Sequence, residues 1–358
     1  MRALAFLTVF VAHSMPFNIL PGGFGVTVFF FLSGYLISTL LRSEAQNTAT
    51  ISLKGFYLRR VQRIFPPCYL TLVVVGILAG AGLLYNVESY KSLVAGFLYF
   101  SNYWNILGWG NLPAGLGVMW SLAVEEHYYL LFPLLYLWFV RRRIRQRHQA
   151  AILLALCALA LVWRCYRAAV LLSPWENIYE GTDTRFDAIL FGCVLAVAAN
   201  PHFDDRIDWL KKHAKLLAAG GAILIVASFA YRNQFFRDTF RYSLQGIALM
   251  PIFFLVALPQ RHLVNRCLEW RVLRHLGRLS YSMYLIHHTL FHHFYHYYRP
   301  GVLVACAIFA MSFAYAQAMR TLVELPIQRA RSRATKRPAE VVPIEPLEKQ
   351  ELQRAAAK

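Results

Sequence analysis

Long apolar runs, repeated along almost the whole chain, constrain this sequence more than any other feature. A helix needs about 20 mostly apolar residues to cross a bilayer. The segments that approach or reach this length are 1–15, 24–42, 66–86, 119–140, 151–172, 183–200, 214–231, 241–259, 279–297 and 301–320. The sequence therefore predicts an all-α integral membrane protein with about ten transmembrane helices. The stretch 91–104 is apolar but too short to span, so a re-entrant or surface-lying segment is expected there.

Composition agrees with a membrane location. Of the 358 residues, 58% are hydrophobic and 15% are charged. In soluble domains about half of the residues are hydrophobic and about a quarter are charged. The net charge of +19 could indicate a nucleic-acid partner. The basic residues instead form short clusters between the apolar runs, so we expect a lipid bilayer and no nucleic acid.

The basic clusters also predict the orientation of the chain. They occupy 42–63, 141–147, 206–215, 261–278 and the region after 320, which fall on alternate loops. The positive-inside rule then places both termini in the cytoplasm, in a multi-pass protein of the cell inner (cytoplasmic) membrane. One exception is an outward loop with Arg232, Arg237 and Arg241, which either attracts an anionic ligand or has no function.

Two further features concern domain organisation and cysteines. Residues 1–327 form the predicted transmembrane domain, and the charged segment 328–358 is expected to be a disordered cytoplasmic tail. The six cysteines show no CxxC spacing and mostly lie in apolar runs. Neither a disulfide framework nor a zinc site is expected.

Ionisable side chains inside apolar runs are costly, so each is a candidate functional residue. Arg2 and His13 are eleven residues apart, which returns them to nearly the same helix face about 16 Å apart. A cation at the cytoplasmic end could hold a nucleotide phosphate while a thioester arm of similar length reaches the imidazole. The alternative is a topological arginine with a structural or helix-capping histidine.

Adjacent carboxylates, Glu125 and Glu126, lie in the fourth apolar segment. They project about 100° apart on a helix. One could orient His13 or act in proton transfer. The other could bind a sugar or pair with Arg164 or Arg167, and a purely structural ion pair is the competing interpretation.

A second acidic pair, Asp183 and Asp187, shares one helix face because the two residues are four apart. With Arg185 between them, these side chains could bind a polar molecule at the outer surface. Capping of a helix N-terminus explains Asp183 equally well.

An arginine cluster precedes the third apolar segment. Arg59, Arg60 and Arg63 lie at i, i+1 and i+4 and would present a group of donors beside the membrane. Arginine is well suited to phosphate. Topology or binding of anionic lipid is the alternative.

Histidines are concentrated near the end of segment 279–297. His288, His292 and His296 follow helical spacing and could hold a metal. No acidic ligand accompanies them and aromatic residues separate them, so an interfacial aromatic belt is favoured and no metal site is expected. His287 differs because it follows the mid-span residues 280–286.

Ordered motifs over residues 2–326 resemble those of the acyltransferase 3 family, membrane acyltransferases that O-acylate cell-envelope glycans. The motifs lie at 2–13, 25–37, 56–66, 120–126, 183–192, 280–287 and 324–326. Thr27 and His127 depart from the pattern, standing where an acid and a glutamine are usual. No esterase-like domain follows the last helix, so the resemblance implies the stand-alone form.

The resemblance implies transfer of an acyl group, by default acetyl, from cytoplasmic acyl-CoA to a hydroxyl of a lipid-linked or surface glycan. Acyl-CoA would be a co-substrate, with no tightly bound cofactor. The expected catalytic residues are His13, Glu125 and Glu126. Donor binding is expected from Arg2, Arg59, Arg60, Arg63 and, through the thioester oxyanion, Ser33; acceptor binding is expected from Asp183, Arg185, Asp187 and His287. A glycan or anion transporter and a non-catalytic sensor are the alternative functions.

Overall fold

The described part of the chain is helical and contains no β-strand. The computed structural model describes residues 1–14, 22–204, 207–258 and 263–336. The longer helices are α1 (Arg2–Ser14), α2 (Gly22–Thr48), α3 (Leu53–Gly80), α6 (Trp120–Arg141), α7 (Gln146–Ala169), α9 (Thr182–Ala198), α10 (Asp208–Ala230), α12 (Phe240–Ala257), α14 (Arg271–Tyr297), α15 (Val302–Met319) and α16 (Leu325–Lys336). The shorter elements are η1 (Tyr90–Ser92), α4 (Leu93–Phe97), α5 (Ser101–Ile106), η2 (Pro113–Met119), α8 (Trp175–Glu180), α11 (Gln234–Asp238), α13 (Leu263–Leu268) and the π-helical turn η3 (Arg320–Glu324).

Every predicted apolar segment overlaps one of the longer helices, from α1 to α15. Six helices in the described part are long and apolar enough to cross a membrane: α2, α3, α7, α10, α12 and the continuous helix Val302–Ser332. The all-α prediction is therefore confirmed, and the count of ten spans and the orientation of the termini stay predictions.

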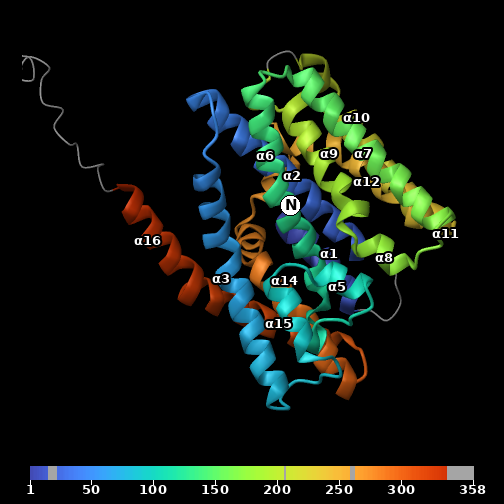
Figure 1. The fold of residues 1–358 in the computed structure, drawn as a ribbon, viewed down its shortest axis with the longest axis vertical. Helices are drawn as coiled ribbons and strands as arrows, with labels where there is room; N and C mark the ends of the chain where they lie inside the picture. Colours follow the sequence, from blue (N-terminus) through green and yellow to red (C-terminus); the bar gives the residue numbers. More distant parts are fainter. Residues whose placement is uncertain (15–21, 205–206, 259–262, 337–358) are drawn as a thin grey trace, which may run out of the picture.

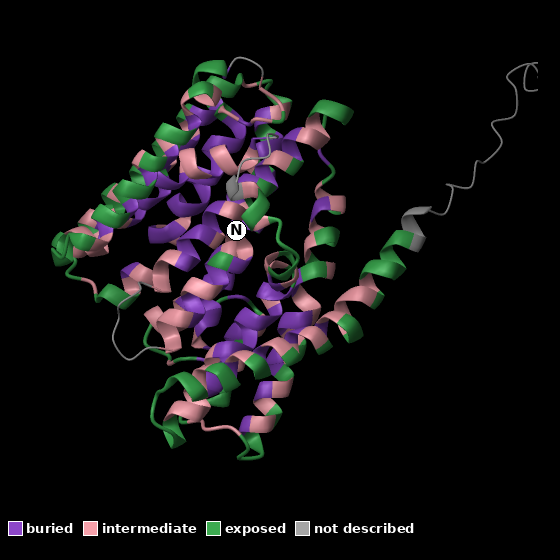
Figure 2. Ribbon diagram, turned by 180° about the vertical axis from the view of Figure 1, so that it is seen from behind, coloured by how far each residue is buried: buried purple, intermediate pink, exposed green. Residues whose placement is uncertain are grey.

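Helices α2 and α9 lie side by side in the middle of the bundle, with α7, α10 and α12 on one flank (Figure 1). Buried side chains are concentrated in these central helices, and the flanking ones expose their outer faces (Figure 2). A Cβ atom on Gly34 would collide with the carbonyl oxygen of Ile189, and one on Gly192 would collide with that of Phe31. Two glycines thus permit the close crossing of α2 and α9, as small residues do in membrane bundles.

Helix α1 has 13 residues and is about 20 Å long, which is short for a bilayer core of about 30 Å. It packs between α2 and α14, with Phe6 fully buried. This packing fixes the direction of the helix, so Arg2 and His13 lie near its opposite ends.

The apolar stretch that is too short to span forms α4, α5 and the loops around them, ending in η2. Ala114 and Gly115 of η2 have positive φ values of 49° and 74°. A Cβ on Gly115 would come 2.6 Å from the Cβ of His292, so this turn packs directly on α14. The segment shapes one wall around the histidines.

The C-terminal helix α16 extends away from the bundle (Figure 1). It continues to Lys336, past the predicted start of the tail at 328. The helix that begins at α15 thus runs on through η3 into this segment, and the division of the chain into a transmembrane domain and a tail stays a prediction. The remaining predicted tail, 337–358, lies outside the described residues.

Candidate active site

Three hollows follow the path between Arg2 and His13. The first, here called the arginine cavity, has a volume of about 700 Å³ and is formed by the ends of α1, α2, α3, α14 and η3. Its charged lining consists of Arg2, Arg59, Arg60, Arg63, Arg278, Arg320, Arg331, Glu44 and Glu324. The excess of arginine over glutamate gives the cavity a positively charged lining, which favours anions.

The second hollow is a narrow slot of about 30 Å³, enough for roughly one water molecule. It shares Arg2 and Tyr281 with the arginine cavity. Aromatic and aliphatic side chains make up most of its walls, and Glu125 is its one acidic lining residue. A slender molecule could pass here only if side chains such as Tyr281 rotate.

The third hollow, here called the histidine cavity, has a volume of about 630 Å³ and contains His13 in its wall. It shares Val26 and Tyr284 with the slot. The three hollows therefore form one line along α1 and α14, with Arg2 at one end and His13 at the other. The predicted alignment of these two residues on one helix face agrees with this arrangement.

His13 is held by two histidines of α14. Its Nδ1 lies 3.0 Å from Nε2 of His287, and the His288 ring stands edge-on to it with ring centroids 4.9 Å apart. The Nδ1 of His287 lies 2.7 Å from the carbonyl oxygen of Tyr284, and that of His288 lies 2.6 Å from the carbonyl oxygen of Gly115. Both α14 histidines must donate from Nδ1, since a carbonyl oxygen only accepts.

These contacts determine the tautomer of His13. His287 is fully buried and no carboxylate of the described residues bonds to it, so the neutral ring is favoured. Its Nε2 then accepts the hydrogen bond that Nδ1 of His13 donates. The Nε2 of His13 is consequently left with a free lone pair, which a general base or a nucleophile requires.

The predicted phosphate-binding arginines come together at the arginine cavity. Arg59 forms an ion pair with Glu44 at 3.1 Å, and the guanidinium of Arg60 lies 5.7 Å from the ring centroid of Phe56. Arg63 lines the same cavity and forms no ion pair with the described residues. The cluster is therefore only partly neutralised.

The glutamates and Ser33 lie away from His13. Ser33 donates a 2.6 Å hydrogen bond to Glu125 and accepts one of 3.1 Å from Tyr129. No hydrogen bond joins Glu125 or Glu126 to His13 in the described part of the chain. Among the described residues the hydrogen-bond partner of His13 Nδ1 is therefore His287, and the hydroxyl hydrogen of Ser33 is engaged by Glu125.

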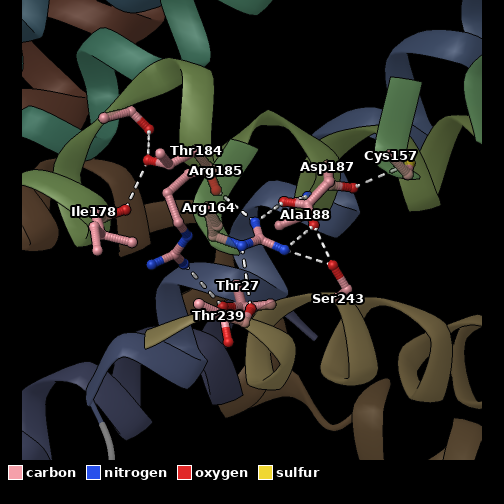
Figure 3. Close-up of polar contacts among 11 residues, drawn as sticks. Thr27, Cys157, Arg164, Ile178, Thr184, Arg185, Asp187, Ala188, Thr239 and Ser243 are labelled. Carbon is pink, nitrogen blue, oxygen red and sulfur yellow. Dashed lines mark hydrogen bonds and ion pairs between the residues drawn. The ribbon is translucent and has the colours of Figure 1, made fainter. Parts of the chain in front are cut away.

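Asp187 is paired with Arg164 inside the bundle, and both side chains are fully buried (Figure 3). The pair is bidentate, with distances of 2.8 and 2.7 Å, and Ser243 donates a further 2.7 Å bond to Asp187. The contacts of Asp187 are therefore made within the protein, and its predicted role in acceptor binding stays a prediction. Arg164 is one of the two arginines expected to pair with the adjacent glutamates, and the tertiary structure joins it to Asp187 instead.

Asp183 lies at the start of α9, where Arg167 contacts it at 3.3 Å and Tyr103 donates a 2.9 Å hydrogen bond. Arg185 is fully buried, with Nη2 donating to Oγ1 of Thr27 at 3.1 Å (Figure 3). The predicted acceptor triad is therefore split among three different environments.

Three residues of α14 that the sequence analysis did not assign to the reaction site complete the path. Tyr281, Tyr284 and His288 lie at i, i+3 and i+7 on α14 and all face the line of hollows or His13. That spacing marks one helix face and could have identified them. His292 and His296 instead stack against Tyr85, and the described residues contain no group of three potential metal ligands.

Comparison with known proteins shows the family to which the chain belongs. Residues 1–320 match the model of the acyltransferase 3 family, whose description is an acyltransferase domain. The chain is 30% identical to the peptidoglycan O-acetyltransferase OatA of Listeria monocytogenes, covering 92% of this chain and 55% of the relative. It is also 32% identical to the putative peptidoglycan O-acetyltransferase YrhL of Bacillus subtilis (81% and 47%) and 30% identical to the O-acetyltransferase OatA of Staphylococcus aureus (92% and 56%).

The chain spans about half the length of these curated relatives. No solved structure matches it. The family match covers most of the chain and includes the arginine cavity residues on α1, α2, α3 and α14 together with His13. The protein is a multi-pass membrane protein and belongs to the acyltransferase 3 family.

Proposed function

We propose that this protein is an O-acetyltransferase of the inner membrane that uses cytoplasmic acetyl-CoA and acetylates a hydroxyl of an envelope glycan. The observation that carries the proposal is the free Nε2 lone pair of His13 at the line of hollows that begins in the arginine cavity. The names of the relatives, which are O-acetyltransferases, support the reaction class. The family match gives no support to the alternative of a transporter.

The donor would bind with its nucleotide phosphates in the arginine cavity. Arg2, Arg59, Arg60 and Arg63 supply charged donors there, and guanidinium groups match phosphate oxygens in geometry. The distance from Arg2 to His13 along α1, about 16 Å, suits a pantetheine arm lying in the slot once Tyr281 and Tyr284 have moved aside.

The chemical step requires one proton transfer and one acyl transfer. In the direct route, Nε2 of His13 takes the proton of the acceptor hydroxyl, whose oxygen attacks the thioester carbonyl carbon. The C–S bond breaks and the CoA thiolate leaves with that proton. In the two-step route, Nε2 itself attacks the carbonyl carbon, the C–S bond breaks and CoA leaves as the thiolate. The acceptor hydroxyl then attacks the acyl carbon, the C–N bond to His13 breaks, and the hydroxyl proton passes to the thiolate. Both routes begin from the tautomer that His287 selects.

The glycan would enter the histidine cavity from the side opposite the arginine cavity. Asp183 and Arg185 are close to this region but make contacts within the protein. We therefore assign acceptor binding to the lining of the histidine cavity and not to the buried Asp187.

The test uses the full-length protein, purified into nanodiscs and supplied with radiolabelled acetyl-CoA and an envelope glycan extract. We expect transfer of label to fall by at least about a hundredfold in His13→Ala. His148→Ala, which removes an exposed histidine at the start of α7, is the matched control and should retain transfer. Full activity in His13→Ala would overturn the assignment.

A further inference from the structure

We infer that the histidine cavity binds the acceptor through a negative charge, so the acceptor is an acidic glycan bearing a carboxylate or phosphate group. This inference rests on the proposed function and names its substrate class. It starts from Arg232, Arg237 and Arg241, the basic residues of the loop that breaks the charge pattern of the other outward loops. All three line the histidine cavity, so the arginines that depart from the charge pattern are also the ones that form part of the cavity wall.

These three arginines are not neutralised. In the described part of the chain none of them forms an ion pair, and the guanidinium of Arg241 lies 5.5 Å from the ring centroid of Tyr242. The acidic residue in this cavity lining is Asp238, and both of its carboxylate oxygens accept hydrogen bonds from Gln234, at 2.9 and 2.8 Å. The cavity mouth therefore keeps an excess of positive charge, which favours an anion.

A fourth cation lies directly behind the cavity wall. Arg185 is fully buried, and its guanidinium stacks on Tyr242 at 4.0 Å and Tyr179 at 5.0 Å from the ring centroids. Among the described residues its hydrogen bonds go to neutral oxygens, those of Thr27 and of the Tyr179 backbone, and the nearby Asp187 carboxylate is ion-paired with Arg164. A buried charge with no carboxylate hydrogen-bonded to it adds to the positive potential of the cavity that these aromatic rings line.

The same wall suits a sugar. Trp120, Trp175, Tyr179 and Tyr242 line the cavity, with Tyr179 in contact with both tryptophans at centroid distances of 4.8 and 5.6 Å. Large aromatic faces with a few polar groups are typical of small-ligand sites. A headgroup of an anionic lipid would use the arginines alone, whereas the combination with an aromatic wall favours an acidic saccharide.

The experiment separates envelope glycans by anion exchange into a neutral and an acidic pool. Each pool is offered, with radiolabelled acetyl-CoA, to the full-length protein at low salt, in nanodiscs of phosphatidylcholine alone and in nanodiscs that also contain phosphatidylglycerol. The variants are the double substitution Arg237→Gln with Arg241→Gln, the matching double substitution to lysine, and Arg299→Gln. Arg299 is an exposed arginine of the loop between α14 and α15 that does not line the cavity.

We expect label in the acidic pool. The amount of this pool needed for half-maximal rate should rise about tenfold or more in the double glutamine variant, because a charge-assisted hydrogen bond is lost. The double lysine variant and Arg299→Gln should change that amount much less. Label mainly in the neutral pool, or an unchanged requirement in the double glutamine variant, would overturn the inference and leave the proposed function standing. If the double glutamine variant loses activity only in nanodiscs that contain phosphatidylglycerol, the arginines bind lipid, and the inference is overturned as well. Failure to release CoA with either pool would overturn the proposed function itself.

Discussion

The Nδ1 of His13 donates a 3.0 Å hydrogen bond to Nε2 of His287, joining α1 to a helix 274 residues later in the sequence. Because His287 donates in turn to the carbonyl of Tyr284, one buried ring decides which nitrogen of His13 is free. A backbone carbonyl cannot change its role with pH, so the tautomer is fixed by the fold.

His287 should therefore act as a positioning residue. Replacing it with leucine removes the acceptor for His13 Nδ1–H, and we expect kcat to fall by about ten- to a hundredfold with little change in KM for acetyl-CoA. His287→Gln, whose amide oxygen can accept the same hydrogen bond, should recover part of the rate. Equal loss in the leucine and glutamine variants, or a raised KM in place of a lowered kcat, would contradict this role.

The arginine cavity should determine donor affinity. Arg60→Gln with Arg63→Gln should raise KM for acetyl-CoA by about ten- to a hundredfold, because each charge-assisted hydrogen bond to phosphate contributes about 1.5–3 kcal/mol. The effect should weaken as salt rises. Arg142→Gln, an exposed basic residue outside the cavity, serves as the control. Steady-state rates at several ionic strengths would reveal whether KM for acetyl-CoA differs between the double variant and the Arg142→Gln control.

The buried pair of Arg164 and Asp187 should contribute to stability more than to acceptor affinity. Asp187→Asn leaves the arginine without its counter-ion, which costs about 3–5 kcal/mol at a buried site. Thermal unfolding of the detergent-purified protein should show a lower midpoint, and Arg164→Met combined with Asp187→Leu should restore part of it. A variant of normal stability that fails only in acceptor binding would return Asp187 to the acceptor site.

The crossing of α2 and α9 should tolerate no side chain at its glycine positions. Gly34→Ala places a methyl group against the carbonyl of Ile189, and overpacking of this kind costs about 1–3 kcal/mol or more. Gly220→Ala in α10, where no atom lies within 4 Å of the added methyl, should be neutral or slightly stabilising. Comparing the yield of folded protein for the two variants by size-exclusion chromatography provides the check.

Local sequence patterns determined much of this protein. Runs of about 20 apolar residues predict helices wherever they occur, since backbone groups in a membrane must bond within the helix. Helical periodicity alone placed Arg2 and His13 on one face, and the spacing of Arg59, Arg60 and Arg63 predicted a cluster of donors. These properties depend only on neighbours within a few turns.

Tertiary structure decided the partners of the buried polar groups. His13 bonds to His287 and not to the adjacent glutamates, Glu125 bonds to Ser33, and Asp187 bonds to Arg164. Periodicity gives the face on which a side chain lies but not the helix that packs against it. That choice follows from close contacts such as the glycine crossing of α2 and α9, which set the rotation and depth of each helix and hence the polar atoms that meet.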